Sequence, residues 1–304
     1  MKYGIILIAF FSFFISCAQK EIKKEDVMNQ DNIKKAIVFF NINYLSCSTE
    51  ILINDIPIYK NLNGKDKAGE SFSFQINEYL LKSGKQELTI RIYPASNEKD
   101  ILNSSISNSS NLKVNIIYGD PKIQKIKDYQ TAINYETNNS TIDPHTPFIE
   151  IKKEFYIQSL PYELKGWSES VSLVKEDKNK LESEVVQFYN DFRDNYTSKD
   201  IDQLSGKIYK KEFEKSEANY FKSKDDTQKI LNSLLKEIDT VQTMLSIEHY
   251  KMFFYGNGKV VALVRIDNEF RGESVIIGET EDNYNFYPIY LHRPRSGAPL
   301  EIIR

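Results

Sequence analysis

The sequence predicts a β-sandwich followed by an α+β domain. In the first half of the chain, apolar residues alternate with a period of two, as half-buried strands require. After Trp167 the apolar spacing becomes helical, and from Tyr250 it returns to two. The length of 304 residues is enough for two domains, at about 150 residues per domain.

Residues 1–16 are expected to form a signal peptide. A positive charge at Lys2 precedes an apolar run over 5–15, which is shorter than the ~20 residues that span a bilayer. Residues 14–17, Phe-Ile-Ser-Cys, resemble a bacterial lipobox, although Phe14 replaces the usual leucine. This resemblance implies cleavage between Ser16 and Cys17 and a lipid anchor on Cys17. The alternative is a plain signal peptide with an incidental cysteine.

The lipobox resemblance further implies that Cys17 carries two or three acyl chains, palmitate among them. Two or more chains make an effectively permanent anchor, so we expect the protein on the outer membrane of a bacterial cell envelope, at its periplasmic or its surface face. Residues 17–34 are charged and have no apolar periodicity, which predicts a flexible tether. The second cysteine, Cys47, lies in strand-like sequence and is expected to be buried and structural.

Residues 35–167 are expected to form the sandwich. Strict alternation appears in 71–76 and 87–93, and further strands are expected at 36–43, 49–53, 113–118 and 148–157. The stretch Ile51–Ile58, followed by Gly84–Ile92, resembles immunoglobulin-like β-sandwich modules. Such modules are mostly binding or spacer units, and that resemblance implies the same class here.

Residues 168–304 are expected to form the α+β domain. Between Leu181 and Tyr196 the apolar residues share one helical face, and two further helical patterns span 201–208 and 230–238. Strands are then expected at 250–255 and 259–266, around the turn Gly256-Asn257-Gly258, and at 274–278, 286–291 and 300–303. Helices followed by such strands predict helices on a curved antiparallel sheet.

This order of elements resembles the NTF2-like cone, in which helices pack across a bent sheet and enclose a pocket. Some domains of this family are enzymes with an Asp–His pair in the cone. The sequence shows no such pair, since His249 begins one expected strand and His292 follows another.

Composition and motifs exclude several functions. The chain has 40 basic and 43 acidic residues, a net charge of −3, so it is not a strongly basic nucleic-acid-binding protein. It contains no HExxH or CxxC spacing, no Gly-x-Ser-x-Gly elbow and no glycine-rich phosphate loop. We therefore expect no metal, no cofactor and no enzymatic activity.

The C-terminal tract is the candidate contact site. Arginine and aromatic residues anchor many protein interfaces, and the tract could present a basic, aromatic-edged patch to an acidic partner or an anionic ligand. A turn between two closing strands is the alternative. The candidate partner-binding residues are Tyr287, Tyr290, His292, Arg293 and Arg295.

The sequence therefore predicts a non-enzymatic, membrane-anchored lipoprotein that binds a protein partner or a small ligand. An immunity-type lipoprotein that neutralises a secreted toxin is a narrower alternative. A second alternative is an enzyme whose pocket lies in the C-terminal domain and includes His249 or His292. A third is a spacer subunit of a surface complex.

Overall fold

The first half of the protein consists of eight strands in two antiparallel sheets. The computed structural model describes residues 34–99, 101–137, 143, 145–220 and 224–304, so the expected signal peptide, Cys17 and nearly all of the expected tether lie outside the described residues. The sheets have the strand orders β4-β1-β6-β7 and β3-β2-β5-β8. The strands are β1 (Ile37–Leu45), β2 (Cys47–Ile53), β3 (Ile56–Asn61), β4 (Gly69–Gln75), β5 (Gly84–Pro94), β6 (Asn111–Gly119), β7 (Gln130–Glu136) and β8 (Ile149–Ile157).

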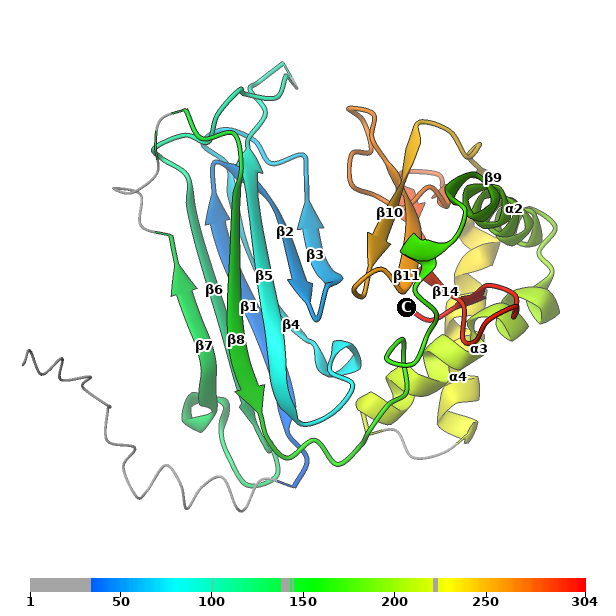
Figure 1. Ribbon diagram of the computed structural model, residues 1–304, viewed down its shortest axis with the longest axis horizontal. Coiled ribbons are helices and arrows are strands. Elements are labelled where there is room, and N and C mark those ends of the chain that lie inside the picture. Colours follow the sequence, from blue (N-terminus) through cyan, green and yellow to red (C-terminus); the bar gives the residue numbers. More distant parts are fainter. Residues whose placement is uncertain (1–33, 100, 138–142, 144, 221–223) are drawn as a thin grey trace, which may run out of the picture. The chain divides into compact units, whose positions relative to one another are not determined.

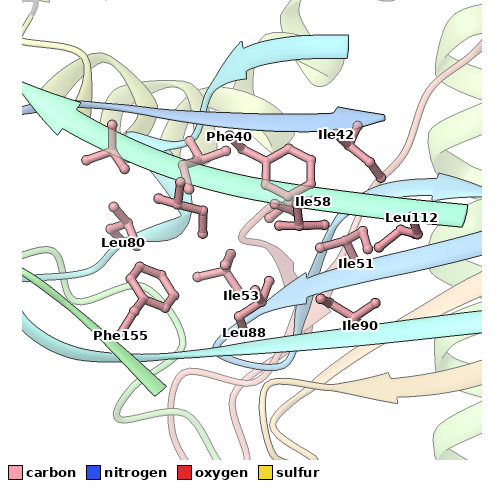
Figure 2. Close-up of a cluster of buried hydrophobic side chains, with 14 of the residues drawn as sticks. Phe40, Ile42, Ile51, Ile53, Ile58, Leu80, Leu88, Ile90, Leu112 and Phe155 are labelled. Atoms are coloured by element: carbon pink, nitrogen blue, oxygen red, sulfur yellow. The ribbon is translucent and has the colours of Figure 1, made fainter. Parts of the chain in front are cut away.

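The two sheets share one apolar core, which Figure 2 shows in part. Alternate residues of each strand point inward, because successive side chains of a strand lie on opposite faces. Phe40 and Ile42 of β1 thus share the core with Ile51 and Ile53 of β2 and with Leu88 of β5. Each fully buried side chain of this size contributes about 1.5–3 kcal/mol of transfer free energy. The predicted sheet-rich first half is confirmed.

Strand β2 is buried along its whole length, and therefore on both faces. Ile51 and Ile53 face the sandwich core, whereas Leu52 belongs to a second buried cluster shared with the C-terminal half. The side chains on the same face as Leu52, those of Ser48 and Glu50, are buried as well. A sheet with both faces covered is the framework on which the candidate site is built.

The C-terminal half begins with helices, as predicted. They are α2 (Lys178–Thr197), α3 (Ile201–Ala218) and α4 (Lys224–Lys236). Short 3-10 helices occur in both halves: η1 (Asn77–Tyr79) and η2 (Ile126–Asp128) in the first, and η4 (Leu173–Lys175) and η5 (Glu237–Thr240) in the second. Asp177 caps α2 by accepting a hydrogen bond from the Lys180 amide at 2.8 Å, and Asp200 caps α3 at the Gln203 amide at 3.1 Å. The face of α2 that the spacing predicts is the one that is buried: Leu181, Val185, Tyr189 and Phe192.

The strands after the helices form two small antiparallel sheets, not the one curved sheet that the sequence led us to expect. The orders are β10-β11-β14-β15 and β13-β12-β9. An isolated antiparallel bridge joins Val264 of β11 to Ser274, in the segment before β12. The strands are β9 (Thr243–Met244), β10 (Tyr250–Tyr255), β11 (Val260–Arg265), β12 (Ile277–Glu279), β13 (Tyr284–Phe286), β14 (Leu291–His292) and β15 (Glu301–Ile302).

Several local predictions differ from the structure. Strands β3, β7 and β9 were not expected. The expected strand 286–291 is divided, because Phe286 ends β13, Leu291 begins β14, and the residues between them are not extended strand. The backbone amide of Tyr287 instead donates to the Ile276 carbonyl at 2.9 Å, and the amide of Ile303 donates to the Tyr290 carbonyl at 2.9 Å. The chain therefore changes sheets within this stretch.

The two halves meet along a buried interface within one compact unit, Ile33–Arg304. Leu52 and Ile56 of the sandwich pack in one apolar cluster with Trp167, Tyr255 and Val260, and Figure 1 shows β2 and β3 on the side of the sandwich nearest to β10 and β11. The interface is also polar. The backbone amide of Gly256 donates to the Asp55 carbonyl at 2.9 Å, and Arg304 Nε donates to the Glu78 carbonyl at 3.1 Å.

Candidate functional site

A cavity of about 290 Å³ lies where this interface opens. Its walls come from β2, β3 and β5 of the sandwich and from β10 and β11 of the C-terminal half, together with the loops that follow β3, β5 and β11. The lining residues are Ser48, Glu50, Lys60, Leu62, Tyr93, Leu102, Phe253, Tyr255, Val264, Arg265, Ile266 and Arg271.

The period of two in β2 explains why charge reaches this cavity. Ser48 and Glu50 occupy the face of β2 that turns away from the sandwich core, on which Leu52 packs against the C-terminal half. A charged residue in an otherwise buried strand is costly unless it is paired. The Glu50 side chain therefore requires partners, and the structure supplies two.

Glu50 is only 6% exposed. Its Oε2 accepts a hydrogen bond from Arg91 Nη1 at 2.9 Å, and its Oε1 accepts one from the Tyr255 hydroxyl at 3.4 Å. Arg91 also donates from Nε to Glu150 at 2.9 Å. Burial together with the nearby Glu50 carboxylate raises the pKa of Tyr255, so its hydroxyl stays protonated and acts as a donor.

Lys60 brings a positive charge to the same cavity from β3. Burial lowers the pKa of its ammonium, and the charges of Glu50 and Glu273 partly offset that effect. Burial likewise raises the pKa of Glu273, against the opposing influence of Lys60. Among the residues that the structure describes, no carboxylate forms an ion pair or hydrogen bond with Lys60 Nζ.

Arg265 ends β11 at the cavity wall and is only 5% exposed. Its Nε donates to Asp267 Oδ2 at 2.6 Å, and its guanidinium carbon lies 5.4 Å from the centre of the Phe270 ring. Nearby, Arg271 donates to the Asn268 side chain at 2.5 Å. The cavity lining thus contains three cations and one carboxylate, Glu50, which is already paired.

Apolar side chains form the mouth of the cavity. Leu102 and Ile266 line it and are 42% and 51% exposed. The Tyr93 ring, also in the lining, packs against Phe148 with ring centres 5.1 Å apart. The cavity therefore combines an apolar entrance with charged and hydroxyl groups at buried positions, the arrangement typical of small-molecule sites.

A second polar cluster surrounds His292 of β14. The Ser170 hydroxyl lies 2.6 Å from its Nδ1, and the Glu301 carboxylate of β15 lies 2.9 Å from its Nε2. A carboxylate can only accept, so Nε2 carries the proton and Nδ1 accepts from Ser170. Lys210 of α3 completes the cluster, with Nζ bonded to Glu301 and 3.4 Å from Nε2.

A serine, a histidine and a carboxylate are bonded here in the same order as in a nucleophilic triad. The surroundings of His292, however, differ from those of a catalytic base. His292 is 1% exposed, and burial followed by the Lys210 charge lowers its pKa to about 4. A general base at neutral pH works best with a pKa near 7. Ser170, His292 and Glu301 do not line the cavity between the two halves. These observations favour a neutral, structural histidine.

The structure does not bring the candidate C-terminal residues to one exposed surface. Tyr290, His292 and Arg293 are buried, because the tract packs into the sheet and its charges are paired; only Arg295 is fully exposed. The half-buried Tyr287 packs against Tyr196, with ring centres 4.6 Å apart and the rings tilted by 38°.

Arg293 serves a local role. Its Nε and Nη2 donate to Glu176 at 2.9 Å, and Nη2 also donates to Glu184 of α2 at 2.7 Å. Bidentate pairing of this kind fixes the guanidinium in place. The same side chain borders an open hollow of about 680 Å³ between α2 and the loop 297–300. Contact with a partner at this tract stays a prediction.

Three further findings bear on chemistry. Cys47 is a free, buried thiol, as expected, and burial raises its pKa to about 12. Among the described residues, no three histidine, cysteine or acidic side chains are grouped closely enough to hold a metal ion. In the same part of the chain, no helix combines the length and the apolar character needed to cross a bilayer.

Sequence reasoning missed the cavity between the halves. Its lining residues are spread from 48 to 271 and meet only through the tertiary structure. One local signal was present: Glu50 is a charged residue within the apolar run 49–53. Comparison with known proteins found no match to this chain among family models, curated proteins or solved structures.

Proposed function

We propose that this protein is a lipid-anchored binding protein of the bacterial cell envelope, and that its ligand site is the cavity between the two halves. The observation that carries the proposal is the lining of that cavity, where buried charged groups from both halves meet behind an apolar mouth. Groups of this kind fix the orientation of a bound molecule. Binding, and not catalysis, is favoured because Glu50, the acidic lining residue, is held by Arg91 and Tyr255.

The same proposal extends to the families of the two halves. Two facing four-stranded antiparallel sheets support an immunoglobulin-like sandwich, which commonly serves as a binding or spacer unit. Three helices followed by antiparallel strands support an NTF2-like arrangement in the second half. Neither family alone decides function, since one fold hosts many activities.

The test of the cavity is a ligand screen on two matched variants. Ile266→Trp adds bulk at the mouth, whereas Ile201→Trp adds the same bulk on α3, which does not line the cavity. Both isoleucines are exposed, so neither change disturbs the core. Compounds from a thermal-shift screen should bind the wild type and Ile201→Trp equally and lose affinity for Ile266→Trp. Ligands that bind all three proteins equally would disprove the proposal.

The test of the anchor uses Cys17→Ser. Because the acyl chains would be attached to Cys17, we expect this variant to leave the membrane fraction as a folded protein that still binds its ligand. Recovery of the variant in the membrane fraction would refute the lipid anchor. Metabolic labelling with an acyl precursor gives an independent readout, with incorporation expected in the wild type alone.

A further inference from the structure

The charges of the cavity lining are unbalanced. Lys60, Arg265 and Arg271 are cations, and Glu50 is the one carboxylate in the lining. Both Glu50 oxygens already accept hydrogen bonds, Oε2 from Arg91 and Oε1 from Tyr255. An incoming cation would therefore meet a carboxylate whose charge Arg91 already balances, whereas an incoming anion would meet cations that still have donors without partners.

Among these cations, Lys60 most clearly has donors without partners. Within the part of the chain that the structure describes, its ammonium makes no hydrogen bond and no ion pair, although it is partly buried. An ammonium has three donors, and leaving them unmet away from water is costly. An anion in the cavity would offset that cost.

Arg265 offers a second, directional donor. Its Nε is bonded to Asp267, and the face of its guanidinium lies on the Phe270 ring. In the described residues no hydrogen bond involves its two terminal nitrogens. Paired donors of a guanidinium match the two oxygens of a carboxylate.

The rest of the lining is suited to an apolar body. Leu62, Phe253 and Val264 line the cavity, and Leu102 and Ile266 at its mouth leave apolar surface exposed to water. Each methylene that moves from water into such a site contributes about 0.8 kcal/mol. The apolar groups are on the exposed side and Arg265 is buried, so a ligand would enter with its charged end first.

We propose that the cavity binds an amphipathic carboxylate, with its head on Lys60 and Arg265 and its aliphatic body along Phe253 and out between Leu102 and Ile266. This inference rests on the proposed function, because it names the ligand class of the same cavity. By this proposal, cationic amphiphiles should not bind. Neutral amphiphiles should bind more weakly than carboxylates, because they would make the apolar contacts alone.

The experiment titrates the full chain carrying Cys17→Ser, so that no acyl group of its own competes, with three probes below their micellar concentrations. The probes are dodecanoate, dodecanol and dodecylamine, which share one chain and differ in the charge of the head. Calorimetry should give the tightest binding for dodecanoate. Loss of one charge-assisted contact in Lys60→Met should weaken dodecanoate by roughly 10- to 100-fold and leave dodecanol unchanged.

Two further variants serve as controls. Lys60→Arg keeps the charge and should stay within a few-fold of the parent, and Lys180→Met removes an exposed lysine of α2 and should have no effect. Equal affinity for the three probes, no binding of any of them, or dodecanoate binding that survives Lys60→Met, would overturn the ligand class. The proposal that the cavity is a ligand site would then still be tested by the comparison of Ile266→Trp with Ile201→Trp. Dodecanoate binding that Ile266→Trp leaves unchanged would overturn both proposals.

Discussion

His292 makes the stability of this protein depend on pH in a calculable way. Its ring is buried, and its pKa is lowered from 6.5 to about 4 by burial and then by the charge of Lys210. A base whose pKa is lowered by folding binds protons more readily in the unfolded chain. Stability is therefore complete above the unfolded value, falls as the pH drops through 6.5, and stops falling below about 4.

The size of the effect follows from the two pKa values. The full shift is 6.5 to about 4, and at about 1.36 kcal/mol per unit it amounts to about 3 kcal/mol. Between about pH 7 and about pH 5, His292 alone should lower the free energy of unfolding by about 2 kcal/mol. Within that range Glu301 stays ionised, because its pKa is lowered by Lys210 and His292 despite its partial burial.

The assay is urea denaturation at about pH 7 and about pH 5 for the wild type and two variants. His292→Gln removes the titrating group. Between the two pH values its free energy of unfolding should therefore fall by about 2 kcal/mol less than that of the wild type, whatever the stability of the variant at pH 7. His145→Gln removes an exposed histidine and should behave as the wild type does. Equal pH dependence in the wild type and His292→Gln would refute the neutral, structural role of this histidine.

Three other predictions concern the core, the interface and the free thiol. Ile53→Ala removes a fully buried side chain of β2 and should cost about 2–5 kcal/mol in urea denaturation, whereas Ile101→Ala, which is exposed, should cost little. Glu214→Gln leaves the buried Arg304 guanidinium without its carboxylate and should lower the unfolding free energy by about 3–5 kcal/mol. Arg304 also donates to the Glu78 carbonyl of the sandwich, so the midpoints of both halves should fall together, and a shift in one half alone would contradict the shared interface. In a Cys17→Ser background, Cys47 should react with a thiol reagent only after denaturation, because it is buried and its pKa is about 12; rapid reaction in the native protein would contradict this.

The predictable parts of the fold are those whose residue pattern is local. The strict alternation in 87–93 and the helical face from Leu181 both reappear as the buried sides of β5 and α2. Strand β7 escaped prediction because its inward residues Ile133 and Tyr135 give too short an alternation. A register shift opposite it, between Ile116 and Ile117, breaks the pattern further.

The role of the C-terminal tract could not be predicted from local sequence. Its composition, rich in tyrosine and arginine, indicated an interface, but composition does not distinguish a residue that meets a partner from one that meets its own chain. Arg293 finds Glu176 and Glu184 in an earlier segment, and Tyr290 packs on Tyr255 with ring centres 5.7 Å apart. These contacts bring together residues more than 30 positions apart, which no local pattern encodes.

The position of the cavity couples ligand binding to the union of the two halves. Glu50 and Lys60 belong to the sandwich, and Phe253 and Arg265 belong to the C-terminal half, so a bound molecule would contact both. The unfolded chain has no such cavity, and a ligand at 100 times its dissociation constant would add about 2.7 kcal/mol to the free energy of unfolding. That amount is comparable to the loss expected on breaking one buried ion pair, such as the Glu214–Arg304 pair of the C-terminal half. Separation of the halves would release the ligand, so occupancy of the cavity would stabilise the junction between them by up to that amount.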